Sequence, residues 1–139
     1  LEAFNMAARL FIKALFEEIP PYSDLAELMA TAVAKPSKER TQNEERRLSA
    51  LFCLRTWLLL SERLLRIKLG MKEESPLYGK PIELKLFEAA AHFTSARIQA
   101  IIDMLLNALR KVQIANPLLA MDALLTEICA SGGLSERII

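Results

Sequence analysis

Apolar residues recur along this chain at intervals of three and four positions, the spacing of one face of an α-helix. The clearest case follows Thr94 or Ser95, either of which can cap a helix by accepting hydrogen bonds from backbone N–H groups. Its apolar stripe holds Ile98, Ile101, Ile102, Leu105, Leu109 and Val112, and its polar face holds Gln99, Asp103, Asn107 and Arg110. No segment alternates apolar and polar residues as half-buried strands do. The pattern predicts an all-α fold.

Breaks in this periodicity divide the chain into six predicted helices. Proline cannot donate the helical hydrogen bond, and glycine favours the left-handed conformation that ends helices. The expected helices cover residues 1–18, 23–33, 44–69, 82–92 and 95–112, and a last one that begins at Asn116 and Pro117 and ends at Gly132–Gly133. The residues after Gly133 are expected to be loose. The predicted architecture is a single bundle of about six helices over residues 1–139.

The segment 44–69 is the longest of these helices, and Gly70 can terminate it. Its middle part carries so few polar residues that apolar side chains cover most of its circumference. We therefore expect it to be the central helix, surrounded by several neighbours. Trp57 on this helix is either a core anchor or an interface anchor, and its apolar surroundings favour the core.

Length and composition suit one such domain. A chain of 139 residues, 53% hydrophobic and 25% charged, can bury a core without disulfides or metals. The 18 Lys and Arg against 17 Asp and Glu leave a net charge of +1, which provides no broad field for a polyanion. The longest run without charge, residues 112–121, is far shorter than the ~20 apolar residues of a membrane span. We expect a cytoplasmic protein that does not enter a membrane.

Residues that could carry catalysis are sparse. The only histidine is His92, so neither a His-rich zinc site nor a di-metal site with paired Glu-x-x-His motifs can be built. Glu88 can share a helix face with His92, but an ordinary pair of polar residues is the simpler interpretation. The four glycines form no phosphate-binding loop. Cys53 and Cys129 lie in apolar stretches without a CxxC motif, which favours buried, reduced thiols. We expect no catalytic residue, metal, cofactor or small-molecule ligand.

The end of the long helix carries a basic tip made of Arg63, Arg66 and Lys68. These side chains can meet phosphate or an acidic partner, and we consider them candidate partner contacts. The same charges also complement the negative end of the helix dipole, which is the competing interpretation.

Two segments carry a resemblance to a known family. SERLLRIKLG, which ends at Gly70, is similar to the pattern Arg-Asp-Leu-Leu-x-x-Lys-x-Gly, and NPLLAMDALLTEI, which begins at Asn116, is similar to Asn-Pro-x-Leu-Ala-x-Glu-x-Leu-Leu. Both patterns belong to the collar domain of the delta-prime subunit of bacterial DNA polymerase III. The second segment matches at Asn116, Pro117, Leu119, Ala120, Leu124 and Leu125, and Asp122 stands where the family has Glu. These positions are expected to form a cap and a buried stripe. The collar domain of the related gamma/tau subunit is the close alternative.

The resemblance covers about residues 44–130 and implies a subunit-assembly domain of the clamp loader. In that family an amino-terminal AAA+ module handles nucleotide, and the carboxy-terminal helical domains pack side by side into a collar. The chain would be this helical domain, cut from a longer bacterial protein. It would bind other clamp-loader subunits, gamma/tau and delta, and reach DNA only through the complex. A nucleic-acid-binding module and a regulatory or chaperone module are the alternatives, and residues 1–43 match no part of the family pattern.

Overall fold

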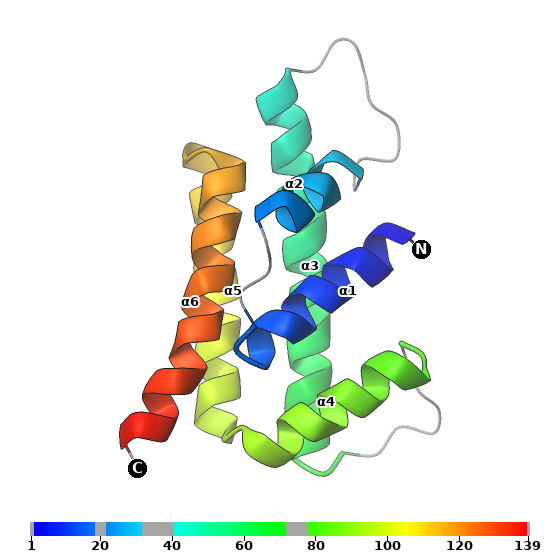
Figure 1. Cartoon of the computed structure of the whole chain (residues 1–139), viewed down its shortest axis with the longest axis vertical. Coiled ribbons are helices and arrows are strands. Elements are labelled where there is room, and N and C mark those ends of the chain that lie inside the picture. The colour runs from blue at the N-terminus through cyan, green and yellow to red at the C-terminus, as the bar shows by residue number, and fades with distance from the viewer. Residues whose placement is uncertain (1, 19–21, 32–40, 72–77, 139) are drawn as a thin grey trace.

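The computed structural model of the chain describes residues 2–18, 22–31, 41–71 and 78–138. These residues contain no strand and form the following helices: α1 (Glu2–Leu15), α2 (Tyr22–Thr31), α3 (Gln42–Lys68), α4 (Lys80–His92), α5 (Ser95–Ile114) and α6 (Pro117–Ile138). The predicted all-α bundle is confirmed. Helices α3, α5 and α6 run along the long axis, and α1, α2 and α4 cross α3 on one side (Figure 1).

Helix α3 is the central element, because it contacts each of the other five helices. Its Trp57 is fully buried, and the indole N–H donates a hydrogen bond to the carbonyl oxygen of Ala7 in α1 at 2.8 Å. The indole also stacks on the ring of Phe11, with ring centroids 6.0 Å apart. The core interpretation of Trp57 is therefore confirmed. A tryptophan buried in this way usually needs a partner for its N–H, and α1 supplies it.

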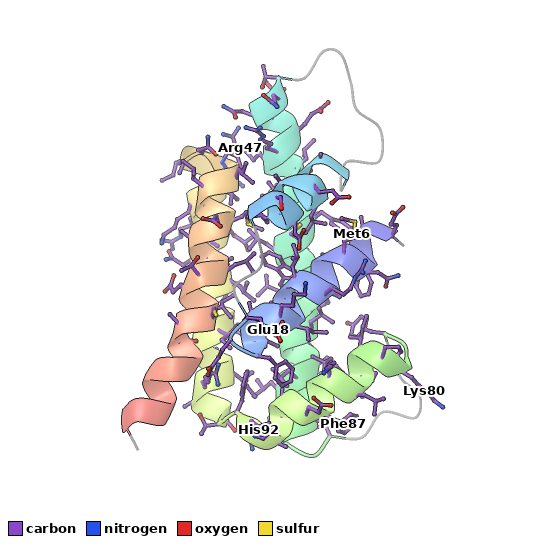
Figure 2. The ribbon with its side chains drawn as sticks, in the orientation of Figure 1. Met6, Glu18, Arg47, Lys80, Phe87 and His92 are labelled. Carbon is purple, nitrogen blue, oxygen red and sulfur yellow. The ribbon has the colours of Figure 1, made fainter. Side chains whose placement is uncertain are left out.

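Two polar side chains of α3 hold neighbouring helices in place. The hydroxyl of Ser49 donates to the carbonyl oxygen of Met29 in α2 at 2.6 Å, within the buried region. The Nε of Arg47 donates to the carbonyl oxygen of Val112 near the end of α5 at 2.9 Å, at the end of the bundle where Figure 2 labels Arg47. Because each bond joins segments far apart in sequence, the two contacts restrict how α2 and α5 can slide along α3.

The starts of the last two helices follow the sequence closely. Thr94 is the N-cap of α5, and its hydroxyl oxygen accepts a hydrogen bond from the N–H of Arg97 at 3.1 Å. The side-chain oxygen of Asn116 accepts from the N–H groups of Leu118 and Leu119 at 3.1 and 3.2 Å. Pro117 occupies the first position of α6, where its missing N–H costs nothing. Both predicted start signals are confirmed, and Thr94 rather than Ser95 is the cap.

Several predicted helix ends were wrong. Helix α1 ends at Leu15 rather than at residue 18, and α6 continues through Gly132–Gly133 to Ile138 instead of stopping at the glycine pair. A glycine inside a helix costs about 1 kcal/mol relative to alanine, but it keeps both backbone hydrogen-bonding groups and so does not force a break. Helix α4 begins at Lys80, two residues earlier than expected, since Pro81 is tolerated in the first turn.

Helices α1 and α3 end in the same hydrogen-bond arrangement with different residues at its key position. Glu17 has φ of 65° and Gly70 has φ of 78°, both in the left-handed region. In each case the next N–H, that of Glu18 or Met71, donates to the carbonyl five residues earlier, at 2.8 and 2.9 Å. This is the Schellman arrangement, in which glycine is preferred. Gly70 terminates α3 as predicted, whereas the equivalent end of α1 uses a glutamate.

Replacing Glu17 with Gly is expected to stabilise the domain by about 1 kcal/mol, because a residue with a Cβ costs ~1–2 kcal/mol in this conformation and glycine does not. The matched change Gly70→Ala is expected to destabilise it by a similar amount. An added Cβ at Gly70 would meet no atom within 4 Å, so only backbone strain contributes. Thermal unfolding followed by far-ultraviolet circular dichroism measures the stability of both variants. Shifts of the same sign in the two variants would contradict this account.

Candidate protein-binding surfaces

The described residues hold no cluster of side chains that could bind a metal ion. Among them, no group of three or more His, Cys, Asp or Glu side chains is placed to hold a metal ion. His92 is exposed at one end of α4, with the exposed Phe87 further along the same helix (Figure 2). Glu88 forms an ion pair with Lys85, with Nζ and Oε2 3.5 Å apart.

Among the described residues, no helix has both the length and the apolar character required to cross a bilayer.

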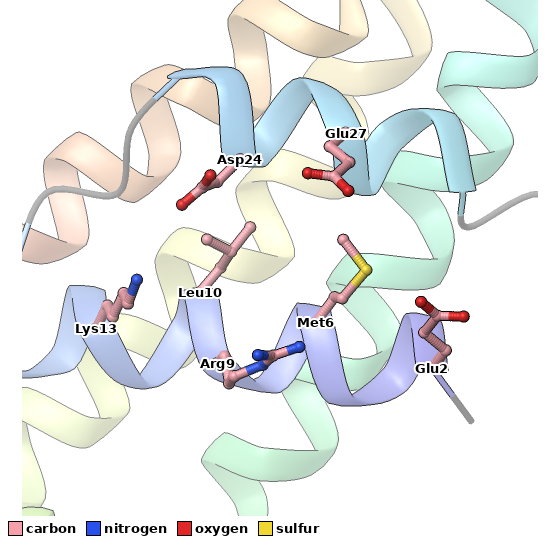
Figure 3. Close-up of a pocket in the computed structure, with 7 residues that line it drawn as sticks. All are labelled: Glu2, Met6, Arg9, Leu10, Lys13, Asp24 and Glu27. Atoms are coloured by element: carbon pink, nitrogen blue, oxygen red, sulfur yellow. The ribbon is translucent and has the colours of Figure 1, made fainter.

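A cleft lined by charged residues lies between α1 and α2 (Figure 3). Arg9 and Lys13 line it from α1, and Asp24 and Glu27 line it from α2; Glu2, Met6 and Leu10 complete the lining. Three carboxylates and two cations line the same cleft, so the charges largely offset one another and leave only a small negative excess.

The structure separates the three residues of the predicted basic tip. Arg63 is buried, with Nε 3.2 Å from each carboxylate oxygen of Glu83 in α4. Lys68 donates through Nζ to a backbone carbonyl of α4 at 3.0 Å. Arg66 is exposed and pairs with Glu62 on its own helix at 2.9 Å. Two of the three cations therefore attach α4 to α3, and the three side chains do not form a shared exposed patch.

The residues of the closing-helix motif divide between core and surface. Leu124 and Leu125 are buried in the core, and Asn116 caps the helix. Leu119, by contrast, is 60% exposed, so the expectation of a wholly buried stripe was wrong at this position. The remaining motif residues are Pro117, which is buried, and Ala120 and Asp122, which are half-buried. The inward positions of α6 follow Leu118 at intervals of three and four, and Leu119 lies outside that series.

Leu119 lies at the corner where α5 ends and α6 begins. Ile114, the last residue of α5, is 87% exposed at the same corner. We call Ile114 and Leu119 the corner patch. Single exposed apolar residues are common on protein surfaces. The corner patch is distinctive because Leu119 belongs to the sequence motif that begins at Asn116 and yet contributes little to the core.

A second apolar surface runs along α3. Its exposed members include Leu48, Leu59 and Leu69, which are 43%, 50% and 61% exposed. Successive residues of a helix are ~100° apart, so Arg55 points about 200° away from Trp57, whose indole contacts α1. We call this side of the helix the outer face of α3; it comprises Leu48, Leu51, Phe52, Arg55, Leu58, Leu59, Glu62, Leu65, Arg66 and Leu69, all exposed or half-buried.

A shallow groove lies in the middle of the outer face of α3. It is lined by Arg55, Leu58, Leu59 and Glu62 on α3 and by Ile102 on α5. Within the described part of the chain, Arg55 has no ion-pair or hydrogen-bond partner. The other residues of the same face are mostly leucines. The groove therefore combines apolar walls with an exposed cation and an exposed carboxylate, which are the elements of a specific protein contact.

Both cysteines are buried free thiols, as the sequence predicted. Burial raises the pKa of the Cys53 thiol to about 12, and a backbone hydrogen bond offsets part of that effect. The pKa of Cys129 is also raised, first by burial and then by the charge of Glu17. Because the thiolate is the reactive form, both residues are poorly suited to nucleophilic or metal chemistry.

Cys53 in a Cys129→Ala variant is expected to resist a disulfide reagent in the folded state and to react once denaturant unfolds the chain. Because burial raises its pKa, the Cys53 thiol ionises at a lower pH in the unfolded chain than in the folded chain. The domain should therefore lose stability as the pH rises above the ordinary thiol pKa of 9.0. The absorbance of the coloured thiol that the reagent releases measures the reaction of Cys53. Rapid reaction of Cys53 under native conditions would contradict it.

Comparison of the chain with protein-family models, with curated proteins and with solved structures found no match. The fold class rests on the structure described above. The likeness to the clamp-loader collar rests on the two sequence motifs alone.

Proposed function

We propose that this chain is a subunit-assembly domain of a bacterial clamp loader, the collar-type domain that holds the complex together while it loads the sliding clamp during replication. The partner would be the helical domain of another clamp-loader subunit, gamma/tau. The observation that carries the proposal is the exposure of Leu119 within the family-like motif of α6. A leucine that contributes little to its own core, at the same helix corner as the exposed Ile114, suits a contact with another protein.

The rest of the chain is consistent with a role in binding rather than in chemistry. The domain itself would not be catalytic, and the replication reaction would belong to other parts of the complex. A nucleic-acid-binding role depended on the basic tip of α3. That role loses its surface, because Arg63 is buried against Glu83 and Lys68 bonds to the backbone of α4. DNA would be reached only through the assembled complex.

Binding of the chain to the helical domain of gamma/tau tests the proposal. The double variant Ile114→Ser with Leu119→Ser is expected to weaken binding by at least about 100-fold, since each large apolar side chain contributes about 1.5–3 kcal/mol when it becomes fully buried. The control variant Leu84→Ser changes a leucine that is 64% exposed on α4, and it should bind as the wild type does. Biolayer interferometry gives the affinities, and circular dichroism checks that each variant is folded.

Absence of binding by the wild-type chain would overturn the clamp-loader assignment. Equal weakening by the corner variant and by Leu84→Ser would remove the corner patch as the binding surface. A normal affinity of the corner variant would have the same consequence.

A further inference from the structure

The outer face of α3 has the same chemical pattern when it is followed in either direction. Its midpoint lies between Leu58 and Leu59, the two leucines at the groove. Residues at equal distances before and after this midpoint form matched pairs: Leu48 with Leu69, Leu51 with Arg66, Phe52 with Leu65, and Arg55 with Glu62. Two pairs are apolar on both sides, one joins a leucine to the long aliphatic stem of an arginine, and one joins opposite charges.

This symmetry has a direct geometric meaning. When two identical helices pack antiparallel about a two-fold axis, each residue lies opposite the residue at the same distance on the other side of the midpoint. An interface of this kind uses the same patch on both copies, so the patch must be complementary to itself. The outer face of α3 meets that condition for its apolar and its charged positions.

We propose that two copies of this chain pair antiparallel along α3, with the two-fold axis between Leu58 and Leu59. The Leu59 side chains would enter the shallow grooves, and Arg55 of each copy would face Glu62 of the partner subunit. The proposal goes beyond the collar assignment, because it uses a surface other than the corner patch and holds whether or not a clamp-loader subunit binds.

The charges select one register. Among the described residues of one chain, Glu62 pairs with the exposed Arg66, and such a surface pair contributes little, about 0–1 kcal/mol. Pairing would place Glu62 between Arg66 of its own chain and Arg55 of the partner subunit, and Arg55 would gain a carboxylate. A two-fold axis placed at Arg55 or at Glu62 would instead bring like charges together, which disfavours those registers.

The size of the face suits a stable pair. From Leu48 to Leu69 it spans ~32 Å at 1.5 Å per residue. Ile102 lines the groove from α5, and Leu106, one turn further along α5, is 50% exposed. Two adjacent helices, packed 8–10 Å apart, present a strip ~20 Å wide. The resulting area of roughly 600 Å² approaches the ~800 Å² that each partner buries in an interface of standard size.

Analytical ultracentrifugation of the full chain at micromolar and submillimolar concentrations tests the pairing. The wild-type chain is expected to form a dimer. Arg55→Glu and Glu62→Arg should each weaken it by roughly 100-fold, because either change brings two pairs of like charges together. An equimolar mixture of the two variants should form a dimer again, since the reversed charges then face complementary ones. Lys111→Glu is the matched control and should dimerise normally, because Lys111 is exposed and lies about 180° around α5 from Ile102.

A wild-type chain that remains monomeric throughout the concentration range would overturn the proposal. Dimers unaffected by either charge reversal, or variants that do not associate when mixed although circular dichroism shows them folded, would also overturn it. A monomeric wild type would leave the gamma/tau binding experiment untouched, and a failure to bind gamma/tau would leave the dimer untouched. The two proposals can therefore fail separately.

Discussion

Replacing Trp57 with Ala is expected to lower the free energy of unfolding by about 3–5 kcal/mol, which is the usual cost of removing a large aromatic side chain from a core. The loss combines two effects. The substitution removes the stacking contact with Phe11, and it also removes the hydrogen bond to the carbonyl oxygen of Ala7. Since native domains are stable by only about 5–15 kcal/mol, this change is a large part of the total.

Trp57→Phe separates the two contributions, because phenylalanine keeps an aromatic ring against Phe11 but cannot donate the hydrogen bond. It should cost about 1–2 kcal/mol. Leu59→Ala, on the outer face of the same helix, is the control and should cost about 0.5 kcal/mol or less in dilute solution. Urea unfolding followed by circular dichroism is the suitable measurement, since the chain has a single tryptophan and the variants lose its fluorescence. A cost below about 1 kcal/mol for Trp57→Ala would show that α1 does not pack on α3 as described.

Removing the carboxylate of Glu83 should be the second most damaging single change, with an expected cost of about 3–5 kcal/mol. Glu83 and Arg63 are 4% and 5% exposed, and they join α4 to the centre of the bundle. Glu83→Ala would leave the Arg63 guanidinium in a buried position without the carboxylate that its Nε faces. Desolvation of that charge, more than the loss of the ion pair itself, accounts for the cost.

The double variant Arg63→Met with Glu83→Leu provides the decisive comparison. When both partners of a buried ion pair become apolar, stability is often unchanged or increased, so the double variant should recover most of the loss. Glu88→Ala is the matched control on α4, because its ion pair with Lys85 is exposed and contributes less than about 1 kcal/mol. Urea unfolding of the wild type and the three variants gives the free energy of unfolding of each. Equal losses for Glu83→Ala and Glu88→Ala would contradict the role of the buried pair.

The features that the sequence predicted correctly are mostly local. Thr94, Asn116 and Gly70 act on backbone groups within a few residues of themselves, so their types and positions were sufficient to identify helix ends. The all-α fold and the central position of α3 followed from periodicity, because a helix that is apolar on most sides must be surrounded. Glu17 was missed as a helix terminator, since residue type alone does not indicate that a glutamate adopts positive φ.

The candidate binding surfaces were less accessible from the sequence. The two motifs identified residues of α6 but assigned Leu119 to a buried stripe, although the apolar spacing of that helix places Leu119 outside the inward series that begins at Leu118. The basic tip was proposed from neighbouring charges on one helix. The partner of Arg63 lies on α4, and only the packing of that helix against α3 determines that the charge is buried.

The sequence by itself determined the class of fold, the number of helices in the described residues, two of the helix caps and the central role of α3, because these depend on interactions between residues close along the chain. Only the tertiary structure decided which side of α3 remains uncovered. Apolar residues surround most of α3 in the sequence, and its neighbours α1, α2 and α4 cross it on one side only. Long-range packing therefore left Leu59, Arg55 and Glu62 on the surface, where a second chain can meet them.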